Sequence, residues 1–389
     1  MKVLHFIHDN KFFAYLQDLF AGLAGVDSRY VALAPGAAPT EFLEGLPLWR
    51  RVGPAYVGSD DARADLEWCD CLVVHFLEPW GARLMLRAPR RVATVWSGWG
   101  GDYLDLLPGT ARSLLGPETR ALVAESARAR RDGLRARARR AYEAAWHRLV
   151  GRRLAAAAAR RADFFSAPLE EDYAELKSAL GPRFRADYVQ LRYGSNEASR
   201  QNLPETPLGE DILLGNSATP TNNHAEALRT LARLDLGARR VVAPLSYGDA
   251  AYGDAVEALG RRLLGARFEP LRRFLPMPEY NARLARCGIV VMNHRRQQGL
   301  GNIAAAMMAG ARVHLDEEGM MYRFFAARGA RVFGVRALAT QGLDGAGALD
   351  AAARDANRRI IGGLWSQAAA EENARRFVER VEGWRRRTA

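Results

Sequence analysis

Cysteine is scarce in this sequence, and long apolar runs are missing. The three cysteines, Cys69, Cys71 and Cys287, are too few for a disulfide framework, and Cys69-x-Cys71 has no second ligand pair with which to bind zinc. No stretch approaches 18 consecutive apolar residues, so we expect no membrane-spanning helix. The first residues form a short apolar run without the long hydrophobic segment of a secretory signal. These absences favour a cytoplasmic protein.

Lysine is also rare, because all but three of the 56 basic residues are arginine in a chain of formal net charge +12. Residues 112–161 contain 14 arginines against four acidic residues, and apolar residues recur there every three to four positions. The segment therefore predicts basic amphipathic helices. Such helices fit a solvated face, a surface that contacts anionic lipid, or a nucleic-acid footprint. Aromatic residues for base stacking are few here, so we favour lipid over nucleic acid as a partner.

Short apolar runs alternate with helical patterns along the whole chain. Strands are expected in the first half at residues 3–8, 30–34, 71–76, 91–96, 163–166 and 188–192. The second half repeats the rhythm, with strands expected at residues 211–214, 240–243, 267–270, 288–292 and 311–315. This alternation predicts an α/β fold with parallel sheets and crossover helices.

The polar, proline-containing segment 196–210 predicts a linker between two Rossmann-like βα domains. We expect an N-terminal domain over residues 1–195, which includes the basic helices, and a C-terminal domain over residues 211–365. A charged helix over residues 366–389 follows, and we expect it to cross back to the N-terminal domain.

The loop at residues 215–224 follows an expected strand and precedes an expected helix, which is where open α/β sheets bind ligands. It has no acidic side chain; its small residues let the backbone approach a phosphate, and its hydroxyls and amides supply donors. The same residues also fit a simple capped turn. We favour an anion site, with these candidates: Gly215, Asn216, Ser217, Thr219, Asn222 and His224.

The loop at residues 293–302 occupies the equivalent position after the strand at 288–292. It combines two arginines, two glutamines and Gly-x-Gly before an alanine-rich helix. Arginine forks match phosphate oxygens, although a basic surface loop would have the same composition. It is neither a Walker loop nor a dinucleotide fingerprint. The candidates for anion binding are Arg296, Gln297, Gln298, Gly299, Gly301 and Asn302.

The loop at residues 96–102 is typical of a sugar site, because indole faces can stack on a sugar and a carboxylate can accept its hydroxyl hydrogens. Trp96 and Trp99 are candidates for acceptor binding, with Asp102 beside them. Asp102, or the pair His8 and Asp9 at the end of the first strand, could serve as a general base. Packed aromatics with a capping aspartate would also explain the loop, but we favour the sugar site. Metal-binding spacings and a strand-end Asp-x-Asp are missing, so we expect neither metal nor cofactor.

Four motifs in order resemble one known family. They are Trp99-Gly100-x-Asp102, Gly215-Asn216-Ser217 with Asn222 and His224, Pro244-x-x-Tyr247, and Arg296-Gln297-Gln298-Gly299-x-Gly301. Together they resemble the TDP-N-acetylfucosamine:lipid II N-acetylfucosaminyltransferases, most strongly over residues 211–315. The two βα domains are likewise similar to the GT-B layout of glycosyltransferases, in which a nucleotide-sugar lies in the cleft between domains. The basic segment at 112–161 is longer than the family leads us to expect.

This resemblance implies a hexosyltransferase that needs no metal. It would move a sugar from a TDP- or UDP-sugar to a polyprenyl-diphosphate-linked glycan of a bacterial surface polysaccharide, at the cytoplasmic face of the inner membrane. The implied donor-binding residues are Arg192, Gly215, Asn216, Ser217, Asn222, His224, Tyr247, Arg296, Gln297, Gln298, Gly299 and Gly301. The alternatives are a GT-B enzyme with a soluble or protein acceptor, and a basic nucleic-acid-binding protein. Donor base, sugar, stereochemical outcome and oligomeric state stay open.

Overall fold

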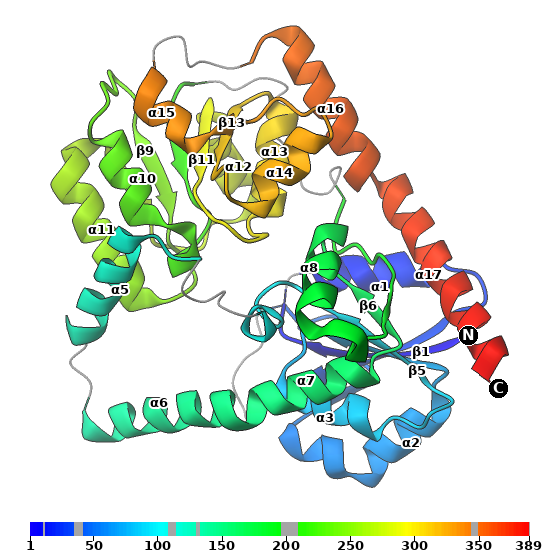
Figure 1. The fold of residues 1–389 in the computed structure, drawn as a ribbon. Coiled ribbons are helices and arrows are strands. Elements are labelled where there is room, and N and C mark those ends of the chain that lie inside the picture. Colours follow the sequence, from blue (N-terminus) through cyan, green and yellow to red (C-terminus); the bar gives the residue numbers. More distant parts are fainter. Residues whose placement is uncertain are drawn as a thin grey trace. The chain divides into compact units, whose positions relative to one another are not determined.

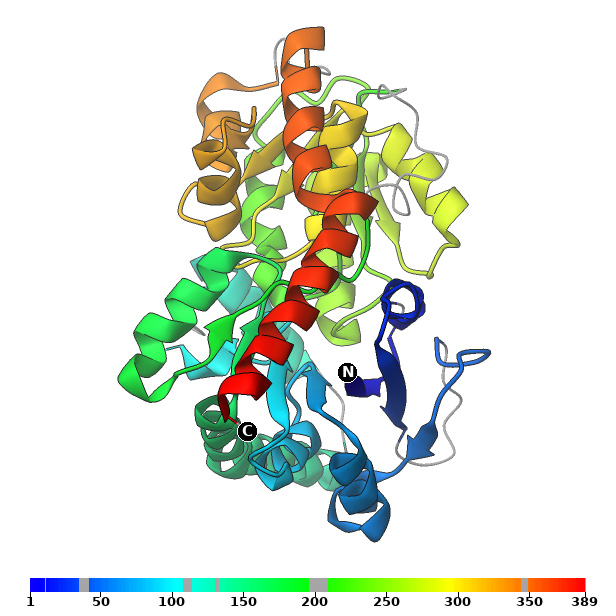
Figure 2. The same ribbon diagram turned by 90° about the vertical axis from the view of Figure 1, so that its right-hand side faces the viewer.

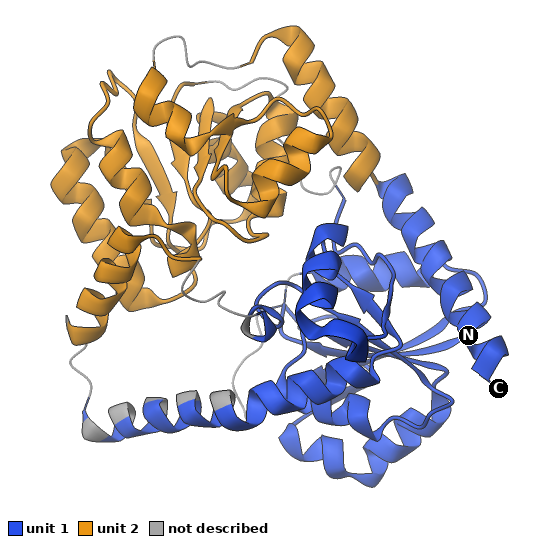
Figure 3. Ribbon diagram, viewed as in Figure 1, with its two compact units in different colours: residues 1–110, 133–195, 367–389 blue, residues 111–132, 196–366 orange. Residues whose placement is uncertain are grey.

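The computed structural model of the protein describes residues 1–10, 12–34, 42–107, 114–129, 133–195, 209–343 and 349–388. The chain forms two compact units (Figure 3). Unit 1 comprises Met1–Thr110, Gly133–Ser195 and Gln367–Ala389, and unit 2 comprises Ala111–Asp132 and Asn196–Ser366. The predicted linker at 196–210 lies almost entirely outside the described residues. No helix among the described residues is long and apolar enough to cross a membrane.

Unit 1 is built on a parallel sheet (Figure 1). The sheet has seven strands in the order β3-β2-β1-β4-β5-β6-β7. Its strands are β1 (Lys2–His8), β2 (Asp27–Leu33), β3 (Arg50–Val52), β4 (Cys71–His75), β5 (Ala93–Ser97), β6 (Phe164–Ser166) and β7 (Asp187–Tyr188). Strand β4 is buried along its whole length, and its side chains alternate between two hydrophobic cores, one on each face. Because such parallel strands are buried on both faces, they are continuous apolar runs in the sequence.

Helices cover both faces of this sheet. The helices of unit 1 are α1 (Phe13–Ala21), α2 (Asp60–Trp68), α3 (Pro79–Arg87), α6 (Leu134–Trp146), α7 (Arg152–Arg161), α8 (Glu170–Leu180) and α17 (Gln367–Thr388), with short 3₁₀ turns η1 (Pro54–Gly58), η2 (Leu104–Leu106) and η4 (Gly181–Arg183) and a π-helical turn η3 (His147–Gly151). Of these, α6 extends beyond the sheet (Figure 1). Helix α17, red in Figure 2, packs against α1 and buries Phe377 and Val381 in the core of unit 1. The predicted return of the C-terminal helix is thus confirmed.

Unit 2 contains a six-stranded parallel sheet in the order β10-β9-β8-β11-β12-β13. Its strands are β8 (Ile212–Leu214), β9 (Val241–Pro244), β10 (Phe268–Leu271), β11 (Ile289–Met292), β12 (Arg312–Leu315) and β13 (Phe333–Gly334). Its helices are α5 (Pro117–Ala129), α10 (His224–Leu231), α11 (Ala250–Leu264), α12 (Met277–Ala285), α13 (Leu300–Ala309), α14 (Met320–Ala327), α15 (Val335–Gln341) and α16 (Ala351–Trp365), with turns η5 (Pro220–Asn222) and η6 (Gly265–Arg267). The predicted doubly wound α/β fold is confirmed, although β3 and β13 were missed and β7 is shorter than the run at 188–192.

Helix α5 differs from the prediction, because residues 111–132 were expected in the N-terminal domain and instead belong to unit 2. The Glu226 carboxylate of α10 accepts hydrogen bonds from the backbone N–H and the hydroxyl of Thr119, in the first turn of α5. Arg229 Nε pairs with Glu118 Oε2 at 2.9 Å, and Leu122 joins the core of unit 2. The arginine-rich segment is therefore split: α5 is packed on unit 2, while α6 and α7 belong to unit 1.

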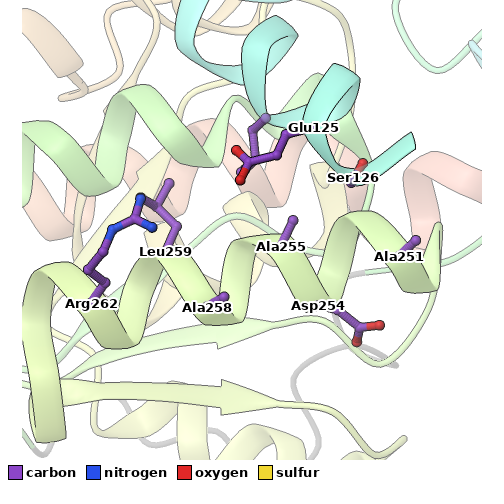
Figure 4. A pocket seen from close by; sticks show the side chains of 9 residues that line it. Glu125, Ser126, Ala251, Asp254, Ala255, Ala258, Leu259 and Arg262 are labelled. Carbon is purple, nitrogen blue, oxygen red and sulfur yellow. The ribbon is translucent and has the colours of Figure 1, made fainter. Parts of the chain in front are cut away.

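A pocket of about 350 Å³ lies between α5 and α11 (Figure 4). Small and apolar side chains line it, with Glu125, Asp254 and Arg262 also at its walls. All of its lining residues come from these two helices. It is therefore separate from the strand-end loops singled out in the sequence.

Candidate functional site

The two predicted anion-binding loops of unit 2 meet at the point where the strand order of its sheet reverses. Strands β8 and β11 are neighbours, with Leu214 paired to Val291, so the loops at 215–224 and 293–302 leave the sheet side by side. Crevices at such reversal points are where doubly wound sheets bind their ligands.

Polar side chains join the two loops directly. Gln298 Nε2 donates to Asn216 Oδ1 at 2.9 Å, and Asn216 Nδ2 donates to the Tyr247 hydroxyl at 3.1 Å. Thr221 Oγ1 donates to Gln298 Oε1 at 2.6 Å and accepts from Arg296 Nε at 3.2 Å. Four residues implied by the resemblance are thus in one network, and the structure adds Thr221, which the sequence reasoning passed over. The signal for Thr221 was weak, since a hydroxyl in a polar loop has many ordinary roles.

Two glycines allow this close approach. Gly215 has φ +67° and Gly299 has φ +63°, in the left-handed region that side chains rarely adopt. A Cβ on Gly215 would come within 2.7 Å of His224 Nε2, and one on Gly299 within 3.3 Å of Asn216 Cγ. Gly299 also caps α13, whose first backbone N–H groups have no carbonyl partner within the helix. The positive end of the helix dipole therefore lies beside Gln298.

The first loop is braced from inside by Asn222, which is fully buried. Asn222 Oδ1 accepts from the backbone N–H of Asn216 at 3.3 Å, and its Nδ2 donates to the carbonyl oxygens of Ser217 and Thr219 at 3.0 and 3.2 Å. The hydroxyls of Ser217 and Thr219 are 2.9 Å apart. These contacts give Asn222 a role in shaping the loop rather than an open donor for a ligand.

The imidazole of His224 is buried, and its Nδ1 lies 3.1 Å from the Tyr252 hydroxyl. Burial lowers its pKa to about 3, so it is neutral at pH 7 and adds no positive charge to the loop. Arg295 is ion-paired with Asp316 and Glu318, at 3.3 and 3.4 Å. Of the two arginines in the second loop, Arg296 is the one that joins the network.

Asn223 ties both loops to the segment before α5. It adopts a left-handed conformation at φ 52°, and its Nδ2 donates to Leu114 O at 2.9 Å and to Asn293 O at 3.0 Å. Its Oδ1 accepts from the N–H of Gly116 at 2.9 Å, while Asn293 Nδ2 donates to Asn223 O at 3.2 Å. This buried crosslink was not predicted.

Exposed apolar side chains follow β9 and β10, whose carboxyl ends lie at the same edge of the sheet as the two loops. Pro244 pairs with Leu271, and three residues beyond each of them come Tyr247 and Phe274, which are 53% and 57% exposed. Met277, at the start of α12, is 49% exposed. Such exposed apolar groups beside a polar site are typical of a ligand surface. Phe274 and Met277 were missed because an isolated apolar residue in a loop carries no pattern.

The corresponding strand-end loops of unit 1 contain the predicted catalytic residues. The His8 ring lies 5.3 Å from the ring of Trp99, between centroids, and burial lowers the His8 pKa to about 4. Asp9 Oδ1 accepts from the Phe42 N–H at 2.9 Å. His8 and Trp99 are thus brought together, and Trp99 is half-buried.

Asp102 and Trp96 do not fit the roles expected of them. Asp102 is partly buried and accepts from the backbone N–H groups of Leu77 and Trp99, at 2.9 and 2.8 Å, and from Trp96 Nε1 at 2.8 Å. Trp96 is fully buried in the core, so its indole face is closed to a sugar. These three hydrogen bonds hold the 96–102 loop in shape, while burial raises the pKa of Asp102. The alternative of packed aromatics with a capping aspartate describes this pair.

Arg192 belongs to unit 1, whereas the other predicted donor-binding residues belong to unit 2. It is only 7% exposed, and its Nη1 donates to Pro168 O at 3.2 Å. Burial lowers its pKa to about 10, which leaves it charged at neutral pH.

Solved structures with the same architecture define the class of the fold. Sucrose-phosphate synthase from Thermosynechococcus elongatus superposes with a TM-score of 0.67 at 13% identity, over 98% of this chain and 100% of its own. HepE of Anabaena, solved in complex with UDP and glucose, gives 0.64 at 14% identity, over 97% and 99%. The lipopolysaccharide outer core galactosyltransferase WaaB gives 0.62 at 8% identity, over 96% and 98%. The chain has the GT-B fold.

Residues 152–333 match the family described as 4-alpha-L-fucosyltransferase, glycosyl transferase group 56. The match takes in every predicted donor-binding residue, from Arg192 to Asn302. The resemblance to a fucosaminyltransferase family is thereby confirmed over this part of the chain. Fold and family match together identify a glycosyltransferase of the GT-B type.

Proposed function

We propose that the protein transfers an amino-deoxy sugar such as N-acetylfucosamine from a TDP- or UDP-sugar to a polyprenyl-diphosphate-linked glycan. The observation that carries this proposal is the family match over 152–333, which spans the joined loops of unit 2. A nucleotide-sugar needs a site for its diphosphate and a surface for its base. The Arg296–Thr221–Gln298–Asn216 network and the exposed Tyr247 and Phe274 supply groups of both kinds.

The diphosphate is assigned to the loop that precedes α13. There the Arg296 guanidinium and the N–H groups at the start of α13 would stabilise charge on the leaving diphosphate as the bond to the sugar breaks. This arrangement supports a reaction in which protein groups supply the positive charge. The base is assigned to the Tyr247 and Phe274 side, where aromatic rings can stack on it.

Acceptor binding is assigned to the strand ends of unit 1, near His8, Asp9 and Trp99. As the acceptor hydroxyl attacks C1 of the sugar, its proton would pass to Asp9 or to the neutral imidazole of His8, and the nucleoside diphosphate would leave. Asp102 is not assigned this step, because its oxygens already accept from three donors.

A thermal-shift screen against TDP, UDP, GDP and CDP, in EDTA and then with Mg²⁺, tests the donor site. A ligand at 100 times its Kd that binds only the folded protein adds about 2.7 kcal/mol to the free energy of unfolding. We expect one pyrimidine diphosphate to raise the melting temperature selectively, and to do so in EDTA. If none of the four shifts the melting curve, the proposed donor site is wrong.

The membrane is the proposed place of action, and α6 is the surface proposed to bind it. Arg135 and Arg139 are exposed on this helix, Tyr142 is 69% exposed, and Leu149 just beyond it is 61% exposed. A basic helix with exposed apolar side chains fits an anionic lipid surface, where each arginine contributes about 1 kcal/mol.

Reversing two of these charges, in the variant R135E/R139E, should weaken binding to phosphatidylglycerol vesicles at least about tenfold, because two attractions become repulsions. Vesicle co-sedimentation measures this change. The matched control, R375E/R376E, alters the same charge on α17, where both arginines pair with Glu372 as Arg139 pairs with Glu143 on α6. Equal loss in both variants would mean that net charge, and not α6, governs the binding.

A further inference from the structure

The hydroxyl of Thr221 sets the direction of the polar network in unit 2. Its Oγ1 faces Arg296 Nε at 3.2 Å and Gln298 Oε1 at 2.6 Å. An arginine Nε–H can only donate, so Oγ1 accepts there and gives its own proton to Gln298. The guanidinium thus decides which way the hydroxyl points.

This direction continues through both amides. Because the carbonyl of Gln298 faces Thr221, its NH₂ group faces Asn216 Oδ1, and Asn216 in turn directs its NH₂ group at the Tyr247 oxygen. Gln298 and Asn216 are only 6% and 7% exposed. Reversing the Gln298 amide would bring two buried carbonyl oxygens face to face, which is costly in the absence of a compensating donor.

The fixed direction of these hydrogen bonds determines which kind of ligand the network can bind. Each NH₂ group keeps a second hydrogen, and the start of α13 presents backbone N–H groups. The hydrogens that remain on these groups are all donors. A diphosphate, whose oxygens only accept at neutral pH, fits such a site.

We propose that Thr221 is a positioning residue for the diphosphate of the sugar donor. It acts through its neighbours, by holding the Arg296 guanidinium and by keeping the Gln298 and Asn216 amides turned with their hydrogens outward. This inference rests on the proposed function, since it takes a nucleoside diphosphate to be the ligand of these loops.

The variant T221V removes the hydroxyl at nearly constant volume, and T221S keeps it. Titration calorimetry of the full chain with TDP and with UDP measures the effect. We expect T221V to bind the preferred diphosphate at least about tenfold more weakly, and T221S to bind it nearly as well as the wild type. T340V is the matched control, because the Thr340 hydroxyl bonds backbone carbonyls of its own helix, and it should bind like the wild type.

A double-mutant cycle with R296A distinguishes positioning from a general loss of structure. If Thr221 acts through Arg296, T221V costs much less affinity in the R296A background than alone. Melting curves without ligand report on folding, and T221A replaces T221V if the valine variant melts well below the wild type. Wild-type affinity in T221V, an equal loss in T221S, or strictly additive losses would each overturn the inference. A wild-type chain that binds no nucleoside diphosphate would overturn the proposed function itself.

Discussion

Replacing Arg296 and Gln298 with alanine in one variant is expected to reduce nucleoside diphosphate affinity at least about 100-fold, because each lost hydrogen bond that involves a charge contributes about 1.5–3 kcal/mol. The variant removes a guanidinium and an amide from the same side of the network. Both side chains lie in a loop, outside the hydrophobic cores, so the fold should persist. Calorimetric titration with the diphosphate that stabilises the wild type measures the change.

The neighbouring arginine provides the control for this variant. R295A removes the same charge from the same loop, but from a side chain held by Asp316 and Glu318. We expect R295A to lower the melting temperature and to leave diphosphate affinity within a few-fold of the wild type. If R295A weakens binding as much as the double variant does, the loop binds through its net charge and the specific network is not required. Unchanged affinity in the double variant would remove the loop from the donor site.

Acidification should destabilise the protein strongly, since most of its seven histidines are buried and neutral. Burial lowers the pKa of His5 and His224 to about 3 and that of His8, His294 and His314 to about 4, and it lowers the pKa of His75 as well. Each of these groups has a folded pKa below its unfolded value, so the unfolded chain binds more protons as the pH falls below about 6.5. The loss then amounts to about 1.4 kcal/mol per histidine and pH unit.

Buried carboxyl groups oppose this trend but do not cancel it. Burial raises the pKa of Asp172 to about 7 and also raises that of Asp102 and Glu78, so these groups favour the folded state as the pH falls. Weighing the histidines against Asp172, we expect the free energy of unfolding to drop by roughly 4 to 6 kcal/mol between pH 7 and pH 5.5. Urea unfolding at a series of pH values measures it. A flat profile over this range would mean that the imidazoles are hydrated in the folded state.

Features that depend on neighbouring residues were predicted correctly. The run at 71–76 is apolar on both faces because β4 is buried on both, and the glycines at 215 and 299 mark turns that only glycine makes easily. Roles that depend on two segments far apart in the sequence were not predicted. Thr221 bonds a glutamine 77 residues away, and nothing beside it in the chain indicates this. The bond that Asp102 accepts from the Leu77 N–H was likewise not foreseen, because Leu77 is 25 residues earlier.

Helix α5 was misplaced for a related reason. Its arginines suggested one continuous basic surface over 112–161, but its register on α10 is set by Thr119 and Glu226, which are 107 residues apart. A local pattern of charge describes the exposed side of a helix and says little about which sheet its other side covers. The same difficulty hid Asn223, whose partners lie 70 and 109 residues away.

The packing of α5 on unit 2, away from its neighbours in the sequence, also affects the order in which the chain can fold during synthesis. Unit 2 takes a helix that the ribosome makes before unit 1 is complete, and unit 1 takes α17, which is made after unit 2. Neither unit can bury its full core as a contiguous nascent segment. During synthesis, Leu122 of α5 stays exposed to solvent until α10 and α11, more than 90 residues later in the chain, leave the ribosome. Transient exposure of this kind is where aggregation begins and where chaperones bind. An isolated fragment of residues 211–365 would meet the same difficulty permanently, because its partner helix is encoded elsewhere.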